Sequence, residues 1–150
     1  MIQRVQSLYL SIAFLFYFLY WFFGLSWYEK GYESIQSHVI FPDFLLSFTS
    51  SIPLIISIIC IIAIFLFKRR SSQIQLTYIA LLLSLFMCLY TILYFFFTLS
   101  TLLTYMPSMF MELLLYAAIL NPFISTLFIF LAMKSIKKDR DLVNSINRLR

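Results

Sequence analysis

Four long stretches of this 150-residue chain contain no Asp, Glu, Lys or Arg. They are Leu8–Tyr28, Phe44–Phe67, Ser71–Met111 and Leu113–Met133. A helix needs about 20 predominantly apolar residues to cross ~30 Å of hydrocarbon, and each stretch reaches that length. Thr, Ser and Pro residues near the end of the third stretch limit its apolar part to about Ile74–Phe97. The sequence therefore predicts four membrane-spanning helices.

The composition agrees with this prediction, because 63% of the residues are hydrophobic and only 11% are charged. Soluble domains carry about 25% charged residues, so this chain could not cover its apolar surface in water. We therefore expect an all-α integral membrane protein, a four-helix transmembrane bundle over residues 1–133. The expected spans are about 8–27, 44–67, 74–97 and 113–133. The first is too long for a cleavable signal peptide and lacks a small-residue cleavage site.

The basic residues predict the orientation of the chain. Of eleven Lys and Arg, only Lys30 falls on the second side of the predicted bundle. The other ten fall on the first side: Arg4, Lys68, Arg69, Arg70, Lys134, Lys137, Lys138, Arg140, Arg148 and Arg150. Because Lys and Arg accumulate in cytoplasmic segments, we expect both termini in the cytoplasm, an N-in and C-in multi-pass topology. This bias also accounts for the net charge of +5, so we do not expect nucleic acid as a partner.

The connections between the spans differ in length. We expect a tight basic turn at Lys68–Ser72 and outer loops at Tyr28–Asp43 and Thr98–Ser108. A short strand or hairpin is an option within Ser34–Phe41, which has an imperfect alternation of apolar residues. Pro53 is expected in the first turns of the second helix, where a missing amide donor costs least.

Residues 134–150 form a basic tail with an apolar pattern. No Gly or Pro follows Pro122, so the fourth helix can continue to the end of the chain. Leu142, Val143, Ile146 and Leu149 are spaced as one helical face, and they stand among Lys137, Lys138, Arg148 and Arg150. We expect an amphipathic cytoplasmic helix that meets the bilayer surface, a second copy of this chain, or another membrane or cytoplasmic protein. Asp139 and Asp141 slightly favour a protein partner.

Small and weakly polar residues recur at spacings of three and four in each span, as at helix contacts in lipid. The predicted packing or pocket positions are Ser57, Thr77, Ser84, Thr91, Asn121 and Ser125. Two interpretations stay open: plain helix packing, or a polar path for an uncharged or lipidic solute. Coupled transport usually needs an ionisable group within the membrane, and no span carries one away from its ends. Pro122 frees a carbonyl near Asn121, so we expect a kink supported by a neighbouring helix.

Patterns that signal catalysis or cofactor binding do not occur in this sequence. The chain has one histidine, His38, and two glycines, which gives neither a zinc ligand set nor a phosphate-binding loop. Cys60 and Cys88 fall in neighbouring spans at depths that differ by about 10 Å, too far apart for a disulfide. We therefore expect no enzyme activity, no cofactor and no metal.

Both ends of the chain are similar to those of a known family. The opening Met1–Leu10 and the closing Ile136–Arg150, with its Ile-Lys-Lys-Asp and Leu-Val motifs before Arg-Leu-Arg, resemble small four-span membrane proteins of Bacteroidota. That family is described only as a domain of unknown function. This chain has Asn144 and Ile146 where the family motif has Arg or Ala. The resemblance implies a bacterial inner-membrane location and no catalytic role.

These observations lead to two functional hypotheses. The first is a non-enzymatic accessory or scaffold subunit of an inner-membrane assembly, because the chain is small, lacks catalytic groups and ends in a patterned tail. The alternative is a small transporter or channel for an uncharged or lipidic solute through the Ser/Thr/Asn-lined interior. The first predicts a protein partner, and the second predicts an open cavity near Ser57, Ser84, Asn121 and Ser125.

Overall fold

The computed structural model describes residues 2–36, 44–104 and 109–148. Within these ranges every element is helical, and no strand occurs. The helices are α1 (Ile2–Gln36), α2 (Phe44–Phe65), the short 3₁₀ helix η1 (Leu66–Lys68), α3 (Arg70–Thr104) and α4 (Met109–Arg148). The predicted all-α fold is thus confirmed for the described part of the chain.

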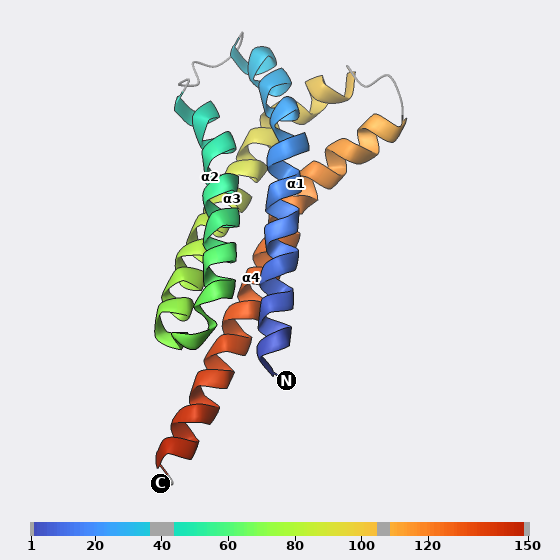
Figure 1. Ribbon diagram of the computed structural model, residues 1–150. Coiled ribbons are helices and arrows are strands. Elements are labelled where there is room, and N and C mark those ends of the chain that lie inside the picture. The colour runs from blue at the N-terminus through green and yellow to red at the C-terminus, as the bar shows by residue number, and fades with distance from the viewer. Residues whose placement is uncertain (1, 37–43, 105–108, 149–150) are drawn as a thin grey trace.

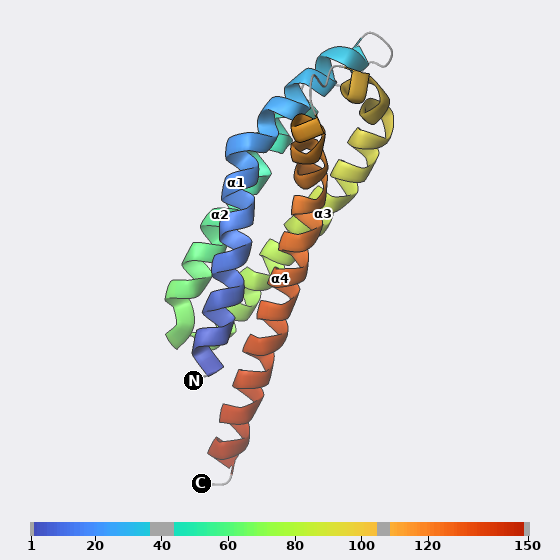
Figure 2. The same cartoon turned by 90° about the vertical axis from the view of Figure 1, so that its right-hand side faces the viewer.

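The helices form an up-and-down bundle, as Figures 1 and 2 show. α1 packs against both α2 and α4, α3 packs against the same two helices, and α2 and α4 lie on opposite sides of the bundle. The start of α1, the α2–α3 turn and the end of α4 lie at one end of the molecule (Figure 1). The end of α1, the start of α2, the end of α3 and the start of α4 lie at the other.

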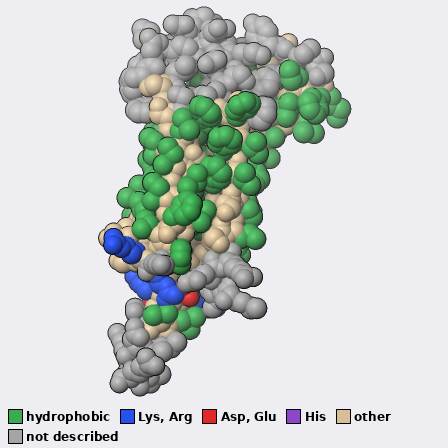
Figure 3. Space-filling view, viewed as in Figure 1, with side chains coloured by type: hydrophobic (Ala, Val, Ile, Leu, Met, Phe, Trp, Pro, Cys, Tyr) green, Lys and Arg blue, Asp and Glu red, His purple; other side chains and the backbone are tan. Residues whose placement is uncertain are grey.

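The surface of the bundle is apolar along its length and basic at one end. Large apolar side chains such as Phe65 (77%), Leu89 (61%) and Phe96 (80%) are mostly exposed. In the view of Figure 3, hydrophobic side chains cover the bundle and Lys and Arg gather near the end where α4 leaves it. This exposure is untenable in water but is what lipid tails require.

Length and composition allow three helices to cross a membrane. The apolar windows are Val5–Phe22 in α1, Arg70–Ser100 in α3 and Met109–Val143 in α4. The described apolar part of α2 covers only Ser51–Phe65, which is shorter, although the whole helix has 22 residues. At 1.5 Å per residue, 22 residues measure about 33 Å, close to the thickness of the hydrocarbon layer.

Two of the predicted outer loops are partly helical. α1 continues to Gln36 and α3 to Thr104, so most of the expected loop residues before 37 and before 105 belong to helices. The Thr98 hydroxyl donates to the Tyr94 carbonyl at 2.9 Å, so it does not interrupt α3. Charged and hydroxyl residues mark where a span leaves the membrane, but they do not have to end the helix. Residues 37–43, which hold much of the proposed strand, lie outside the described residues.

The α2–α3 turn is as short as predicted. α2 ends at Phe65, η1 follows, and α3 begins at Arg70 directly after Arg69. The Arg69 amide donates to the Leu66 carbonyl at 2.9 Å, and the Gln73 amide donates to the Arg69 carbonyl at 3.0 Å. The expected position of Pro53 was wrong, because α2 begins at Phe44 and this proline lies in its interior.

α4 is a single helix of 40 residues that contains Pro122 and includes most of the predicted tail. It changes direction in its upper, orange part and then runs straight past the ends of the other helices (Figures 1 and 2). The expected continuation of the fourth span into the tail is confirmed up to Arg148. We call residues 140–148, which project beyond the bundle, the arm.

Candidate functional site

An ion pair holds α4 where it leaves the bundle. Arg70 Nη2, at the start of α3, lies 3.2 Å from Asp139 Oδ2. Arg70 Nη1 also donates to the Asp139 backbone carbonyl at 3.3 Å. Asp139 is only 8% exposed, so its carboxylate depends on this guanidinium for its charge compensation.

An amide adds a second tie at the same end of the bundle. Gln6 on α1 is buried, and its Nε2 donates to the Ser135 carbonyl on α4 at 3.3 Å. Together, the Arg70–Asp139 ion pair and the Gln6–Ser135 hydrogen bond attach α4 to α3 and to α1 one turn apart. We call these four residues the arm anchor. Because two different helices hold α4 here, the direction of the arm is set by the bundle.

Gln73 makes a matching contact within the α2–α3 hairpin. Its buried Nε2 donates to the Ala63 carbonyl on α2 at 3.0 Å. The amide therefore reaches back across the turn and ties the start of α3 to the end of α2. None of these contacts was predicted, since we assigned Arg70 to topology and interpreted Asp139 as slightly favouring a protein partner of the tail.

A regular spacing of buried residues could have revealed the role of Asp139. The buried positions of α4 include Ser125, Ile129, Ala132, Ile136 and Asp139. Their spacing alternates between four and three, which is the rhythm of a helix-packing seam. Asp139 lies on this seam at a position expected to face a neighbouring helix. A charged residue on a packing seam is a signal for an ion-pair partner.

The predicted hydroxyl positions are buried, and each hydroxyl donates to a carbonyl of its own helix. Ser57, Thr77, Ser84, Thr91 and Ser125 are each at most 3% exposed. Each donates to a carbonyl three or four residues earlier, at 2.7 to 2.8 Å. Such back-bonding uses the proton of the hydroxyl within its own helix. These residues therefore supply small side chains for close helix contact.

Asn121 connects two helices. Its Nδ2 donates to the Phe16 carbonyl on α1 at 3.0 Å, and its Oδ1 accepts from Ser125 at 3.1 Å. Pro122, the next residue, is buried inside α4. We expected a neighbouring helix to support the proline-containing segment, and the hydrogen bond from Asn121 to α1 provides this support.

A cluster of polar groups from all four helices lies in the middle of the bundle. Tyr17 of α1 is fully buried, and Ser84 of α3, Thr126 of α4 and the thiols of Cys60 and Cys88 lie near its hydroxyl. Both cysteines are free and buried.

The direction of one hydrogen bond in this cluster follows from counting protons. Cys88 Sγ lies 3.2 Å from Thr126 Oγ1, and either atom could donate. A threonine hydroxyl has one proton, and Thr126 gives it to the Pro122 carbonyl at 2.7 Å. The Cys88 thiol is therefore the donor, and Thr126 Oγ1 is an acceptor toward its other neighbours.

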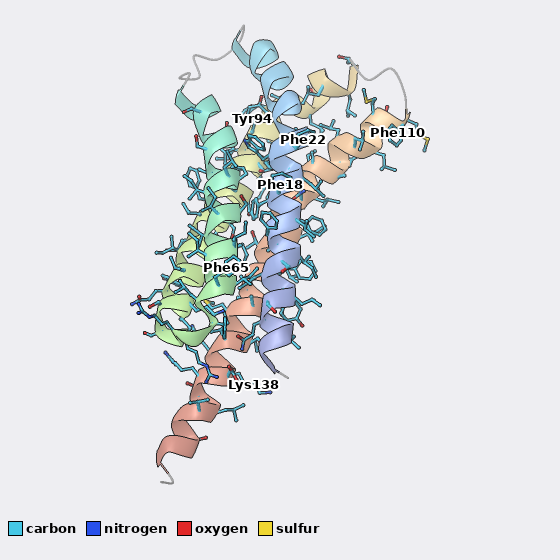
Figure 4. The ribbon with its side chains drawn as sticks, viewed as in Figure 1. Phe18, Phe22, Phe65, Tyr94, Phe110 and Lys138 are labelled. Atoms are coloured by element: carbon cyan, nitrogen blue, oxygen red, sulfur yellow. The ribbon has the colours of Figure 1, made fainter. Side chains whose placement is uncertain are left out.

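The predicted contact residues of the tail lie partly within the described region. Lys137 and Lys138 are exposed, Leu142 is 44% exposed and Val143 is half-buried. Figure 4 shows Lys138 on α4 just below the point where the helix leaves the bundle. The side chains of Ile146, Arg148, Leu149 and Arg150 lie outside the described set.

Within the described ranges, no three His, Cys, Asp or Glu side chains come together to hold a metal ion. His38 falls in 37–43, beyond the described ranges.

Comparison with known proteins agrees with the resemblance seen in the end segments. No curated protein and no solved structure matches this chain. A family model described as a domain of unknown function, DUF4293, matches residues 2–149, which is nearly the full length. The chain therefore belongs to the DUF4293 family.

Proposed function

We propose that this protein is a non-enzymatic accessory subunit of an inner-membrane assembly and that its arm binds a helix of a partner protein. The observation that carries the proposal is the geometry of α4. This helix runs without interruption through Asp139 to Arg148 and is anchored to α1 and α3 just before it leaves the bundle. At 1.5 Å per residue the part after Asp139 extends about 14 Å.

The packing seam of α4 continues into the arm. After Ile136 and Asp139 the same alternation of three and four leads to Val143 and, in sequence register, to Ile146. Within the bundle this seam faces the other helices, but the arm projects beyond their ends (Figures 1 and 2). An apolar seam with a heptad rhythm fits a partner helix.

Contact with a protein fits this geometry better than contact with the bilayer surface. An amphipathic helix that binds a membrane lies in the plane of the interface. The arm instead follows the long direction of the bundle (Figure 1), and the anchor opposes a bend at its base. The exposed carboxylate of Asp141, which pairs weakly with Arg140 at 3.5 Å, also reduces attraction to anionic lipid.

The basic end of the bundle supports a cytoplasmic placement of the arm. The start of α1, the α2–α3 turn and the end of α4 lie together at this end, and they hold most of the Lys and Arg residues. Positive residues next to spans favour the cytoplasmic side of bacterial membranes. The partner on this view is a cytoplasmic protein or the cytoplasmic part of a membrane protein.

The alternative, a transporter for an uncharged solute, gains no support from the described side chains. It requires free polar groups along an open path. Ser57, Ser84 and Ser125 donate to carbonyls of their own helices, and the Asn121 amide donates to α1. These groups are therefore already engaged in the packing of the bundle.

Site-specific photocrosslinking in cells tests the proposal. A photoreactive residue replaces Leu142 on the arm, and a control replaces Leu127, which is exposed on the apolar surface of the same helix. We expect a discrete protein adduct only from position 142, and the same partner after mild detergent extraction of the tagged chain. Failure of position 142 to give more protein adduct than position 127, with extraction at near-monomer size, would refute the proposal.

A further inference from the structure

Three lysines lie together on the outer face of α4, just before the arm. Lys134, Lys137 and Lys138 are all exposed, and residues three and four apart lie on one face of a helix. Ile136 and Asp139, on the opposite face, are buried against the other helices. The three lysines, which we call the lysine cluster, therefore face away from the bundle. Figure 4 shows Lys138 at the level where α4 leaves it.

The carboxylates closest to the lysine cluster in the chain are paired with arginines. Asp139 Oδ2 lies 3.2 Å from Arg70 Nη2, and Asp141 Oδ1 lies 3.5 Å from Arg140 Nε. Among the described residues, no ion pair includes a lysine of the cluster. Because like charges three or four residues apart on a helix repel one another, the cluster carries a positive charge that a bound anion would offset.

The face of α4 that carries the lysine cluster is apolar in the preceding turns. Leu127 and Phe130 are both exposed, and they precede Lys134 by seven and four residues, the spacing of a single helical face. This stripe therefore changes from apolar side chains to ammonium groups within about one helical turn. A phospholipid has the same order of parts, with acyl chains followed by a charged headgroup.

The length of the lysine cluster matches the thickness of a headgroup layer. At 1.5 Å per residue, the helix rises about 6 Å from Lys134 to Lys138. The hydrocarbon core of a bilayer is ~30 Å thick and the whole bilayer ~40–45 Å, so each headgroup layer measures roughly 5–8 Å. A lipid whose acyl chains lie along Leu127 and Phe130 thus brings its phosphate to the height of the lysines. A soluble anion would use the lysines but not the apolar stripe.

We propose that Lys134, Lys137 and Lys138 bind the headgroup of one anionic phospholipid, whose acyl chains lie against Leu127 and Phe130. The cluster selects a headgroup with net negative charge, because the cation of a zwitterionic headgroup would be repelled by the lysines. Each lysine near an anionic lipid surface raises the affinity about fivefold. The site lies on the face of α4 opposite the arm anchor, so it does not depend on the partner of the arm.

Native mass spectrometry of the purified full chain tests the proposal. The chain is titrated with phosphatidylglycerol, which is anionic, or with phosphatidylcholine of the same acyl chains. We expect the first bound lipid to favour phosphatidylglycerol, and the double variant Lys134→Gln/Lys138→Gln to weaken its binding about 25-fold. The matched control, Arg140→Gln, removes an exposed cation from another face of α4 and should change binding by at most about twofold.

Two results of this titration would overturn the proposal. The first is equal binding of the two lipids. The second is an equal loss of affinity in the double variant and in Arg140→Gln, because binding would then follow net charge and not the lysine cluster. A competition with inorganic phosphate tests a soluble anion as the occupant. If phosphate displaces phosphatidylglycerol at a comparable concentration and with the same dependence on the lysines, the lipid assignment is wrong.

Discussion

Breaking the Arg70–Asp139 ion pair should destabilise the protein by an amount that depends on which partner is removed. The Asp139 side chain is 12% exposed and the Arg70 side chain is 25% exposed. Arg70→Ala leaves a short, mostly buried carboxylate without its cation. Asp139→Ala leaves a long guanidinium that can still reach the backbone carbonyl of residue 139, which accepts at 3.3 Å, or extend to water.

The magnitudes follow from these exposures. Breaking a fully buried pair costs 3–5 kcal/mol, and an exposed pair is worth about 0–1 kcal/mol. We expect Arg70→Ala to lower the unfolding free energy by ~2 kcal/mol and Asp139→Ala to lower it by ~1 kcal/mol. The double variant should be less destabilised than the sum of the two, because the unpaired carboxylate is then absent.

The matched control is Arg140→Ala, one residue further along α4. Arg140 pairs with Asp141 at 3.5 Å, and both side chains are well exposed, at 44% and 68%. This substitution should cost at most about 0.5 kcal/mol. Reversible unfolding in mixed micelles measures all four variants on one scale.

A distance measurement tests whether the anchor also directs the arm. Spin labels at Ser71 and Ser145, both exposed, report the position of the arm relative to the α2–α3 turn. We expect a narrow distance distribution in the parent chain and a broader one in Arg70→Ala. The account is refuted if Arg70→Ala is no less stable than Arg140→Ala and leaves the distribution unchanged.

Three further predictions concern the interior of the bundle. Asn121→Ala should lower the unfolding free energy by ~1 kcal/mol because it removes the hydrogen bond to α1. Ser125→Ala should be close to neutral because that hydroxyl donates within α4. Equal losses of stability in the two variants would contradict this assignment. Ala80→Leu should lower the unfolding free energy by ~1–3 kcal/mol because the alanine is fully buried, and unchanged stability would show that this contact is loose. Cys60 and Cys88 should react with a water-soluble maleimide only on unfolding, since both are buried, and rapid labelling of the folded protein would count against the core described above.

The general architecture could be predicted from the sequence because the bilayer restricts what an uncharged apolar stretch can do. Four such stretches and a one-sided distribution of Lys and Arg were enough to predict an all-helical bundle with a continuing fourth helix. The helix ends were harder to predict. Thr98 shows why. It follows the apolar part of the third stretch, yet its hydroxyl donates to the Tyr94 carbonyl and the residue remains within α3.

The contacts that connect the helices were less accessible from the sequence. Small residues mark the face of a helix that packs against its neighbours. The hydroxyls of Ser84 and Ser125 on such faces donate within their own helices, so the pattern does not predict which side chains form hydrogen bonds between helices. The groups that do cross include the amides of Gln6 and Gln73 and the side chain of Arg70. Their partners lie as much as 129 residues away in the chain, and only the folded bundle brings them together.

The central claim is that the bundle is immersed in the membrane while the arm stands clear of it in the aqueous phase. Spin-label accessibility in reconstituted bilayers tests this claim most directly, with labels at Leu127 on the bundle and at Leu142 on the arm. The account predicts that oxygen, which concentrates in lipid, relaxes the label at 127, and that a water-soluble nickel complex relaxes the label at 142. A lipid-like response at position 142 would contradict it.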